Sequence, residues 1–263
     1  MRTLMTEIKR MVHEKRLLWL LGVTVVYVLI CCLFRNYYYR LEYDYVEIHT
    51  DMSAFYLWQD KMGESFMAVL EIMPSLVYVL SFLDDRKNGI DNRICCKNHS
   101  NFYYTAKYIT TMLSGMIFNF LLVILMYFSI YFFLSTGDKG WNYLDRKDAL
   151  IGKYFTGNTA MEFVLLIAVS YAFVGGVCSA MSYVVAMWID NRVLICIMPY
   201  IIFRILGMIF WRRTRFSDTL LGGVDPTMTD TPFAVMVDYF TWWVLLLSIL
   251  LLVSYTYKIE RKR

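Results

Sequence analysis

Residues that could carry out chemistry are few in this chain, and their spacing fits none of the common catalytic motifs. The three histidines, His13, His49 and His99, lie far apart, and no HExxH motif is present, so no zinc protease site is predicted. The sequence also lacks the GxxxxGKS/T phosphate loop and the GxSxG turn that nucleotide-binding proteins and α/β-hydrolases use. We therefore expect no catalytic residue, no metal site and no cofactor in this chain, and we expect that it is not an enzyme.

Charged residues gather instead in one polar segment, residues 84–107, between two long apolar runs. The segment reads DDRKNGIDNRICCKNHSNFYYTAK and carries charges of both signs. Charges in this arrangement set the register and specificity of docking between proteins more than they drive a reaction. We predict a docking surface for a partner in the cytoplasm. On composition alone, an ordinary solvated loop is the better explanation of the segment.

Two further charged residues, Glu71 and Arg204, fall inside apolar runs. A charge at the centre of a membrane costs about 2.5–3.5 kcal/mol on insertion scales, so such residues are often paired or functional. Counting from the ends of their runs places both at a similar depth. We expect them to form an ion pair or to line one cavity on a substrate pathway. The alternative is that each side chain reaches its nearest interface separately.

The elements that must position these residues are long apolar helices. Hydrophobic residues make up 59% of the 263 residues and aromatic residues 17%. Runs of about 18 or more apolar residues are long enough to cross roughly 30 Å of hydrocarbon, and they must be helical there to satisfy their own backbone. The predicted spans are Leu17–Phe34, Phe66–Leu83, Ile109–Leu134, Met161–Ile189, Val193–Phe210 and Phe240–Tyr257. We therefore predict an all-α membrane protein with six transmembrane helices, forming a single domain over residues 1–263.

The distribution of Lys and Arg predicts the orientation. In residues 1–16 the apolar residues recur at helical spacing, and the basic residues lie largely on the other side of the helix. This pattern indicates an amphipathic helix at the lipid interface. Basic residues are more numerous on the side of the chain ends, so both termini are expected in the cytoplasm. Residues 35–65 and 211–239 are then outer loops. Because the basic residues are spread over separate loops, nucleic acid is not an expected partner.

Small residues recur four apart in the fourth predicted span. This spacing lets two helix backbones approach closely, and it involves Gly175, Gly176, Ser179 and Ala180. Pro74 predicts a kink in the second span. The six cysteines form no pattern of a disulfide framework, so we expect free thiols that serve packing.

The segment that follows the second span resembles one found in permease subunits of type-2 ABC exporters. In that family an acidic–basic–Gly motif precedes a short cytoplasmic helix, an aromatic residue and a Lys that begins the third span. The matching residues here are Asp84, Asp85, Arg86, Lys87 and Gly89, then Tyr103 or Tyr104, and Lys107, with Arg93 inside the segment. The overall layout of an amphipathic N-terminus, six spans and two cytoplasmic ends is also similar to this family.

The resemblance implies a permease subunit that works with separate ABC ATPase subunits, which would bind ATP and Mg and dock on residues 84–107. It also implies a second permease subunit, identical or different, in a bacterial plasma membrane. The aromatic outer loops suit an amphiphilic substrate, such as a hydrophobic or antimicrobial peptide, so peptide export or immunity is the expected role. The alternatives are a membrane sensor or assembly subunit that moves nothing, and an ion-coupled secondary transporter, although the inverted repeats of the latter are not evident.

Overall fold

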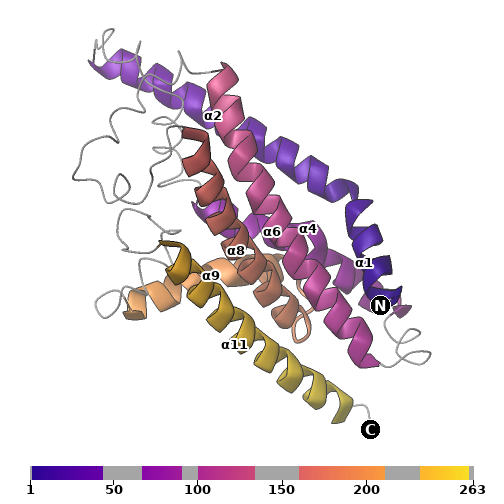
Figure 1. Cartoon of the computed structure of the whole chain (residues 1–263). Helices are drawn as coiled ribbons and strands as arrows, with labels where there is room; N and C mark the ends of the chain where they lie inside the picture. Colours follow the sequence, from indigo (N-terminus) through magenta and orange to yellow (C-terminus); the bar gives the residue numbers. More distant parts are fainter. Residues whose placement is uncertain (1, 44–66, 91–99, 134–159, 211–231, 261–263) are drawn as a thin grey trace.

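A computed structural model describes residues 2–43, 67–90, 100–133, 160–210 and 232–260 (Figure 1). Within these ranges every regular element is a helix, and no strand occurs. The helices are α1 (Arg2–Val12), α2 (Lys15–Tyr43), α4 (Met67–Lys87), α6 (Ser100–Phe133), α8 (Ala160–Ala186), α9 (Arg192–Phe210) and α11 (Pro232–Glu260). The all-helical character of the predicted fold is thus confirmed for the described part of the chain.

Each predicted apolar run coincides with one helix, but several predicted boundaries were wrong. Residues 35–43, assigned to an outer loop, continue α2, and residues 232–239 of the other predicted outer loop begin α11. Backbone hydrogen bonds hold a helix together without apolar side chains, so a helix can extend past its apolar run. Pro232 suits the first position of α11 because the N–H it lacks would have no partner there. The rest of both predicted loops lies outside the described residues.

The polar segment 84–107 is also more helical than expected. Its first four residues form the last turn of α4, and α6 already begins at Ser100. Gly89 ends the α4 region with a positive φ of 65°, a conformation that glycine adopts without steric cost. Its N–H donates to the Arg86 carbonyl oxygen over 3.1 Å. Asp85 and Lys107 are consequently held on helix ends and not on a free loop.

Two helical stretches in the described residues are long and apolar enough to cross a membrane, Phe102–Phe132 in α6 and Ala168–Ala186 in α8. By length and composition alone this is weak evidence, because the buried core helix of a soluble protein passes the same test. A layout of six spans therefore stays a prediction.

Helices α6 and α8 form the centre of the bundle, and they touch backbone to backbone. A Cβ atom added to Gly175 would lie 2.5 Å from the carbonyl oxygen of Gly115 and 2.6 Å from the side-chain nitrogen of Asn119. A Cβ added to Gly176 would lie 2.6 Å from Met116. Only glycine fits these positions without a shift, which explains the small residues four apart in the sequence.

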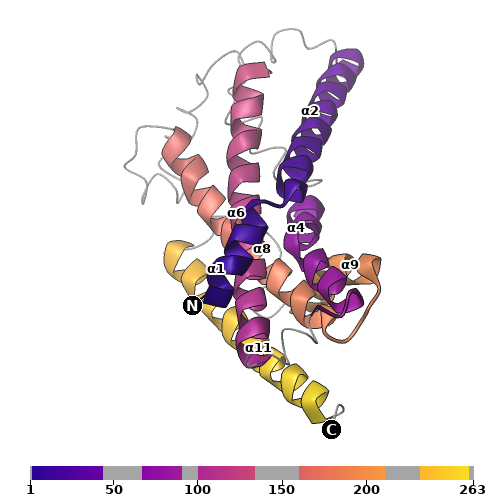
Figure 2. The same cartoon turned by 90° about the vertical axis from the view of Figure 1, so that its right-hand side faces the viewer.

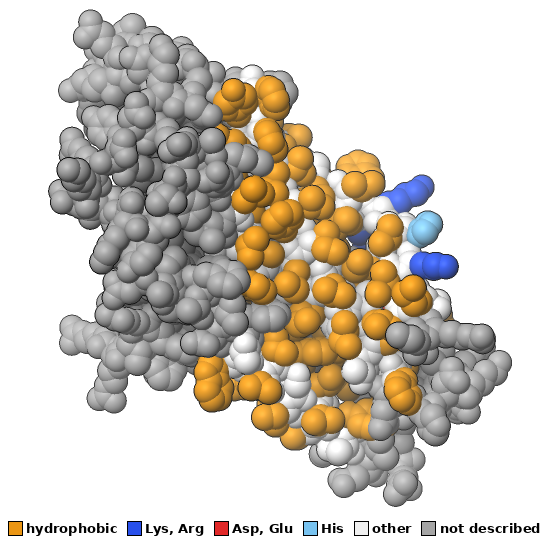
Figure 3. All heavy atoms as spheres, in the orientation of Figure 1, with side chains coloured by type: hydrophobic (Ala, Val, Ile, Leu, Met, Phe, Trp, Pro, Cys, Tyr) orange, Lys and Arg blue, Asp and Glu red, His pale blue; other side chains and the backbone are white. Residues whose placement is uncertain are grey.

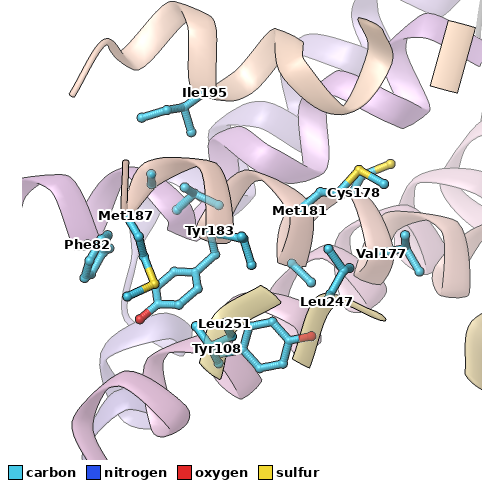
Figure 4. Packing of buried hydrophobic residues seen from close by; sticks show 14 of the residues in the cluster. Phe82, Tyr108, Val177, Cys178, Met181, Tyr183, Met187, Ile195, Leu247 and Leu251 are labelled. Carbon is cyan, nitrogen blue, oxygen red and sulfur yellow. The ribbon is translucent and has the colours of Figure 1, made fainter. Parts of the chain in front are cut away.

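The other helices pack around this pair. Helix α8 contacts α4, α6, α9 and α11, whereas α1 and α2 lie against α6 on the other side (Figures 1 and 2). One apolar cluster joins α4, α6, α8, α9 and α11 around Tyr183, with Phe82, Met187 and Leu251 nearby (Figure 4). Helix α9 crosses the others at a steep angle (Figure 1). Helices α6 and α8 are thus the central pair of the bundle, and the remaining helices pack against them.

Replacing Gly175 by Ala should destabilise the protein because the added methyl group has no room between α6 and α8. Overpacking of this kind typically costs about 1–3 kcal/mol. Gly22 in α2 supplies a matched control, since a Cβ there meets nothing within 4 Å. Gly22→Ala should leave stability unchanged or raise it slightly through helix propensity. Thermal unfolding in detergent compares the two variants, and equal midpoints would contradict the close packing.

Candidate functional site

Lys107 of α6 lies at the centre of a buried ionic cluster at one end of the bundle. Its side chain is fully buried, and its Nζ lies 2.9 Å from Glu7 Oε2 of α1 and 2.8 Å from Asp85 Oδ2 of α4. The ammonium also sits over the ring of Tyr78, 4.7 Å from the ring centroid, where a cation–π contact is favourable. One Lys therefore joins three helices.

Asp85 has more polar contacts than any other group in the cluster. Arg10 of α1 contacts both of its oxygens, at 2.9 and 2.8 Å, and the Tyr103 hydroxyl donates to Oδ2 over 3.0 Å. Burial raises the pKa of Asp85, but the hydrogen bond from Arg10 and the charge of Lys107 outweigh burial and hold the pKa below its usual 3.8. The hydrogen bond to Asp85 in turn raises the pKa of Arg10. The carboxylate is thus fixed in its charged form.

Glu7 completes the cluster from α1. The Tyr78 hydroxyl donates to Glu7 Oε2 over 2.6 Å, next to the contact with Lys107. Two carboxylates, Glu7 and Asp85, therefore balance two cations, Arg10 and Lys107. A buried ion that loses its partner is destabilising by about 3–5 kcal/mol, so these four groups must stay together for the end of the bundle to keep its structure.

A second set of ion pairs lies beside the cluster and is more exposed. Asp84 contacts Arg16 of α2 at 3.2 Å and Arg192 of α9 at 2.5 Å. Arg86 donates to the Ala186 carbonyl oxygen over 3.2 Å and contacts Asp190 at 2.9 Å. These contacts tie the last turn of α4 to the start of α2 and to the α8–α9 connection. Exposed pairs of this kind add about 0–1 kcal/mol each, so their main effect is to orient the helix ends.

The residues predicted to dock on an ATPase now divide into three groups. Asp85, Tyr103 and Lys107 are buried inside the chain, while Asp84 and Arg86 form the outer ion pairs. Lys87 is exposed at the end of α4 and Gly89 lies beyond it, whereas Arg93 lies outside the described residues. Docking stays a prediction for the segment. Asp85, Tyr103 and Lys107 are buried, so they could support the segment from inside but could not contact an ATPase directly.

The structure also brings Glu71 and Arg204 together. Their charged groups on α4 and α9 lie 3.9 Å apart, and the Arg204 guanidinium lies 5.0 Å from the ring centroid of Tyr200. Glu71 is buried, and its Oε2 has no hydrogen-bond partner in the described part of the chain. This arrangement agrees with the predicted ion pair. A substrate pathway at this pair stays a prediction.

The four small residues of α8 that are spaced for close helix packing do lie in the interior of the bundle. Gly175, Gly176, Ser179 and Ala180 are all buried, and the first three face α6 at its closest approach. Cys178 and Cys196 are free and buried, and no cluster of three or more potential metal ligands occurs among the described residues. The side chains of the other four cysteines lie outside the described part of the chain.

Sequence reasoning missed three important residues, Glu7, Arg10 and Asn119. Arg10 lies in the N-terminal segment predicted to be an amphipathic interfacial helix, and its pairing with Asp85 was not expected from the sequence. Glu7 and Arg10 lie three residues apart on one side of α1, but no local pattern tells an internal pair from a solvated one. A lone Asn within an apolar run was a usable signal for Asn119, since a buried amide in such a run needs hydrogen-bond partners.

The lowered pKa of Asp85 predicts how stability changes with pH. A carboxyl whose folded pKa lies below its unfolded value stabilises the fold above the unfolded pKa and loses that contribution as pH falls through the folded value. The contribution of Asp85 to the free energy of unfolding should therefore stay constant down to about pH 4 and decrease below that pH. In Asp85→Asn, stability should be lower at neutral pH and the fall below about pH 4 should be weaker.

The matched control for this experiment is Asp190→Asn, which removes the exposed partner of Arg86. This variant should keep both the neutral stability and the fall in acid. Unfolding midpoints measured from about pH 3 to pH 8, a range that brackets the ordinary carboxyl pKa, would contradict the cluster if Asp85→Asn and Asp190→Asn gave the same curves.

Known proteins offer no template for this site. No family model, no curated protein and no solved structure matches the chain. The geometry of the described helices and the resemblance of residues 84–107 are therefore the grounds on which a function can be proposed.

Proposed function

We propose that this chain is the membrane-spanning permease subunit of an ATP-driven exporter of the type-2 ABC kind. The chain would cross the plasma membrane of a bacterial cell six times, with both ends in the cytoplasm. ATP and Mg would bind to separate ATPase subunits, and a second permease subunit would complete the pore. The observation that carries the proposal is the position of the ionic cluster, at the base of the segment that resembles a coupling element.

The cluster supports this role because it makes the base of the segment rigid. A segment that passes a push from an ATPase to transmembrane helices must not yield at its base. Here Lys107 joins the start of α6 to the end of α4 through Asp85, and to α1 through Glu7. A displacement of the connection between α4 and α6 would therefore move three helices together. An ordinary solvated loop needs no such base.

The apolar surface of the described helices supports a location in lipid. Large apolar side chains are exposed on α2 and α11, among them Trp19 at 73% and Trp242 at 68%. Apolar side chains dominate the coloured part of the face in Figure 3, and among the residues drawn in colour the basic ones appear at one edge. Soluble monomers rarely expose so much contiguous apolar surface. Lipids or a second permease subunit would cover it.

The substrate we propose is an amphiphile, such as a hydrophobic or antimicrobial peptide, and the role is export or self-protection. The Glu71–Arg204 pair lies on α4 and α9 and is open to one side, since the Arg204 side chain is 38% exposed. A pair of opposite charges within apolar helices suits a ligand that carries both polar and apolar groups. The two helices that carry the pair are also joined by the ion pair between Asp84 and Arg192.

The proposal predicts that Lys87→Glu weakens coupling without unfolding the protein. Lys87 is exposed at the end of α4, so charge reversal should alter the docking surface while leaving the buried cluster intact. The variant would be co-expressed with the Walker-loop ATPase encoded nearest to this chain, and co-purification and vesicle transport of a hydrophobic peptide would be measured. Because charges at a docking surface set register and specificity, we expect a loss of ATP-driven transport of about tenfold or more, with an unchanged thermal midpoint.

The control for this experiment is Lys15→Glu, an equal charge reversal at another exposed position, on α2. It should transport normally. Normal transport by Lys87→Glu, or transport by the purified chain with no ATPase present, would contradict the proposed function.

A further inference from the structure

Two prolines interrupt helices in the interior of the bundle. Pro74 lies inside α4 and Pro199 inside α9, and both are buried. In an α-helix each N–H donates to the carbonyl oxygen four residues earlier, and proline has no N–H to donate. The carbonyl oxygens of Leu70 and Ile195 therefore lose their partners within their own helices. A buried carbonyl without a partner is costly, and most of all where water is absent.

Both carbonyl oxygens receive a hydrogen bond from another helix. Asn119 of α6 donates through Nδ2 to the Leu70 carbonyl oxygen over 3.0 Å. Ser182 of α8 donates through Oγ to the Ile195 carbonyl oxygen over 3.0 Å. Each acceptor is the one that a proline leaves free. Both donors are fully buried and come from the central pair α6 and α8.

The surroundings of the donors fit this task. Asn119 also donates to the Tyr171 carbonyl oxygen over 3.0 Å, and it reaches these positions because Gly175 has no side chain to block it. Ser182 Oγ lies 2.7 Å from Ser75 Oγ, next to Pro74. Ser182 has one hydroxyl proton and two acceptors within reach, Ser75 Oγ and the Ile195 carbonyl oxygen. That proton goes to Ile195 when the Ser75 hydroxyl donates to Ser182 and not to the Cys178 carbonyl oxygen 3.5 Å away. Side chains from α6 and α8 thus serve both proline sites.

We propose that Asn119 and Ser182 are positioning residues that replace the N–H groups missing at Pro74 and Pro199, and so set Glu71 beside Arg204. Glu71 precedes Pro74 by three residues, and Arg204 follows Pro199 by five. A proline in a helix interior usually bends the helix, so the hydrogen bonding at each proline influences the direction of the half-helix that carries the charge. The donors at both prolines come from the same pair of helices, α6 and α8. The inference holds whether or not the chain exports a substrate.

Paired substitutions test it. Asn119→Leu removes the donor while keeping the branched shape of the side chain, and Pro74→Ala returns an N–H to the Leu70 carbonyl oxygen. With Pro74 present, Asn119→Leu should lower the unfolding midpoint by about 2–4 °C; in the Pro74→Ala background the shift should fall to less than half. Ser182→Ala and Pro199→Ala should behave in the same way. If Asn119→Leu prevents folding, adding Pro74→Ala should restore it.

The mismatched pairs are the control. Asn119→Leu with Pro199→Ala, and Ser182→Ala with Pro74→Ala, should be closer to additive than the matched pairs. Equal shifts with and without the matched proline, or failure of Pro74→Ala to restore folding, would overturn the assignment. A second measurement concerns position. The non-additivity between Glu71→Gln and Arg204→Gln should fall to less than half in Ser182→Ala, and an unchanged value would exclude the positioning role.

Discussion

The structure depends on a buried Lys that must be neutralised. Lys107 lies near the start of a long apolar helix with no access to solvent, and a charge in that position is tolerated only with partners of opposite sign. Glu7 and Asp85 provide them from other helices, α1 and α4. These contacts hold α1 and the last turn of α4 against the start of α6. Asp85 also binds Arg10, which contacts both of its oxygens.

The interior of the bundle follows the same rule for uncharged polar groups. Glycines at the α6–α8 contact let Asn119 reach two carbonyl oxygens on neighbouring helices. Ser182 serves the carbonyl oxygen that Pro199 leaves free. The ionic network thus joins helix ends at one end of the bundle, and the neutral network supplies hydrogen-bond donors at the two prolines inside it. In the proposed function, the first would receive a push from an ATPase and the second would direct its effect toward Glu71 and Arg204.

The helices were predictable because their signal is local. An apolar run of sufficient length predicts a helix by itself, and the spacing of Gly175 and Ser179 predicted a close contact without naming the partner. The identity of the partners was not predictable. Glu7 and Lys107 are 100 residues apart, and no local pattern around one residue indicates that it pairs with the other. The same limit applies to Asp84 and Arg192. Residues 84–107 were interpreted as a surface in water because charges usually face water, yet Asp85 and Lys107 are directed inward.

The measurement that tests this account most directly is the coupling free energy between Glu7 and Lys107. Glu7→Gln, Lys107→Met and the double variant would be compared with the unaltered chain by chemical unfolding in detergent. Glu7→Gln leaves Lys107 with Asp85 as its one carboxylate partner, and Lys107→Met leaves the buried Glu7 carboxylate without the Lys107 cation. The double change removes both charges of the pair, so we expect the double variant to be about 1–3 kcal/mol more stable than the sum of the single effects predicts. Additivity within about 0.5 kcal/mol would mean that the two charges do not interact, and the account of this end of the bundle would be wrong.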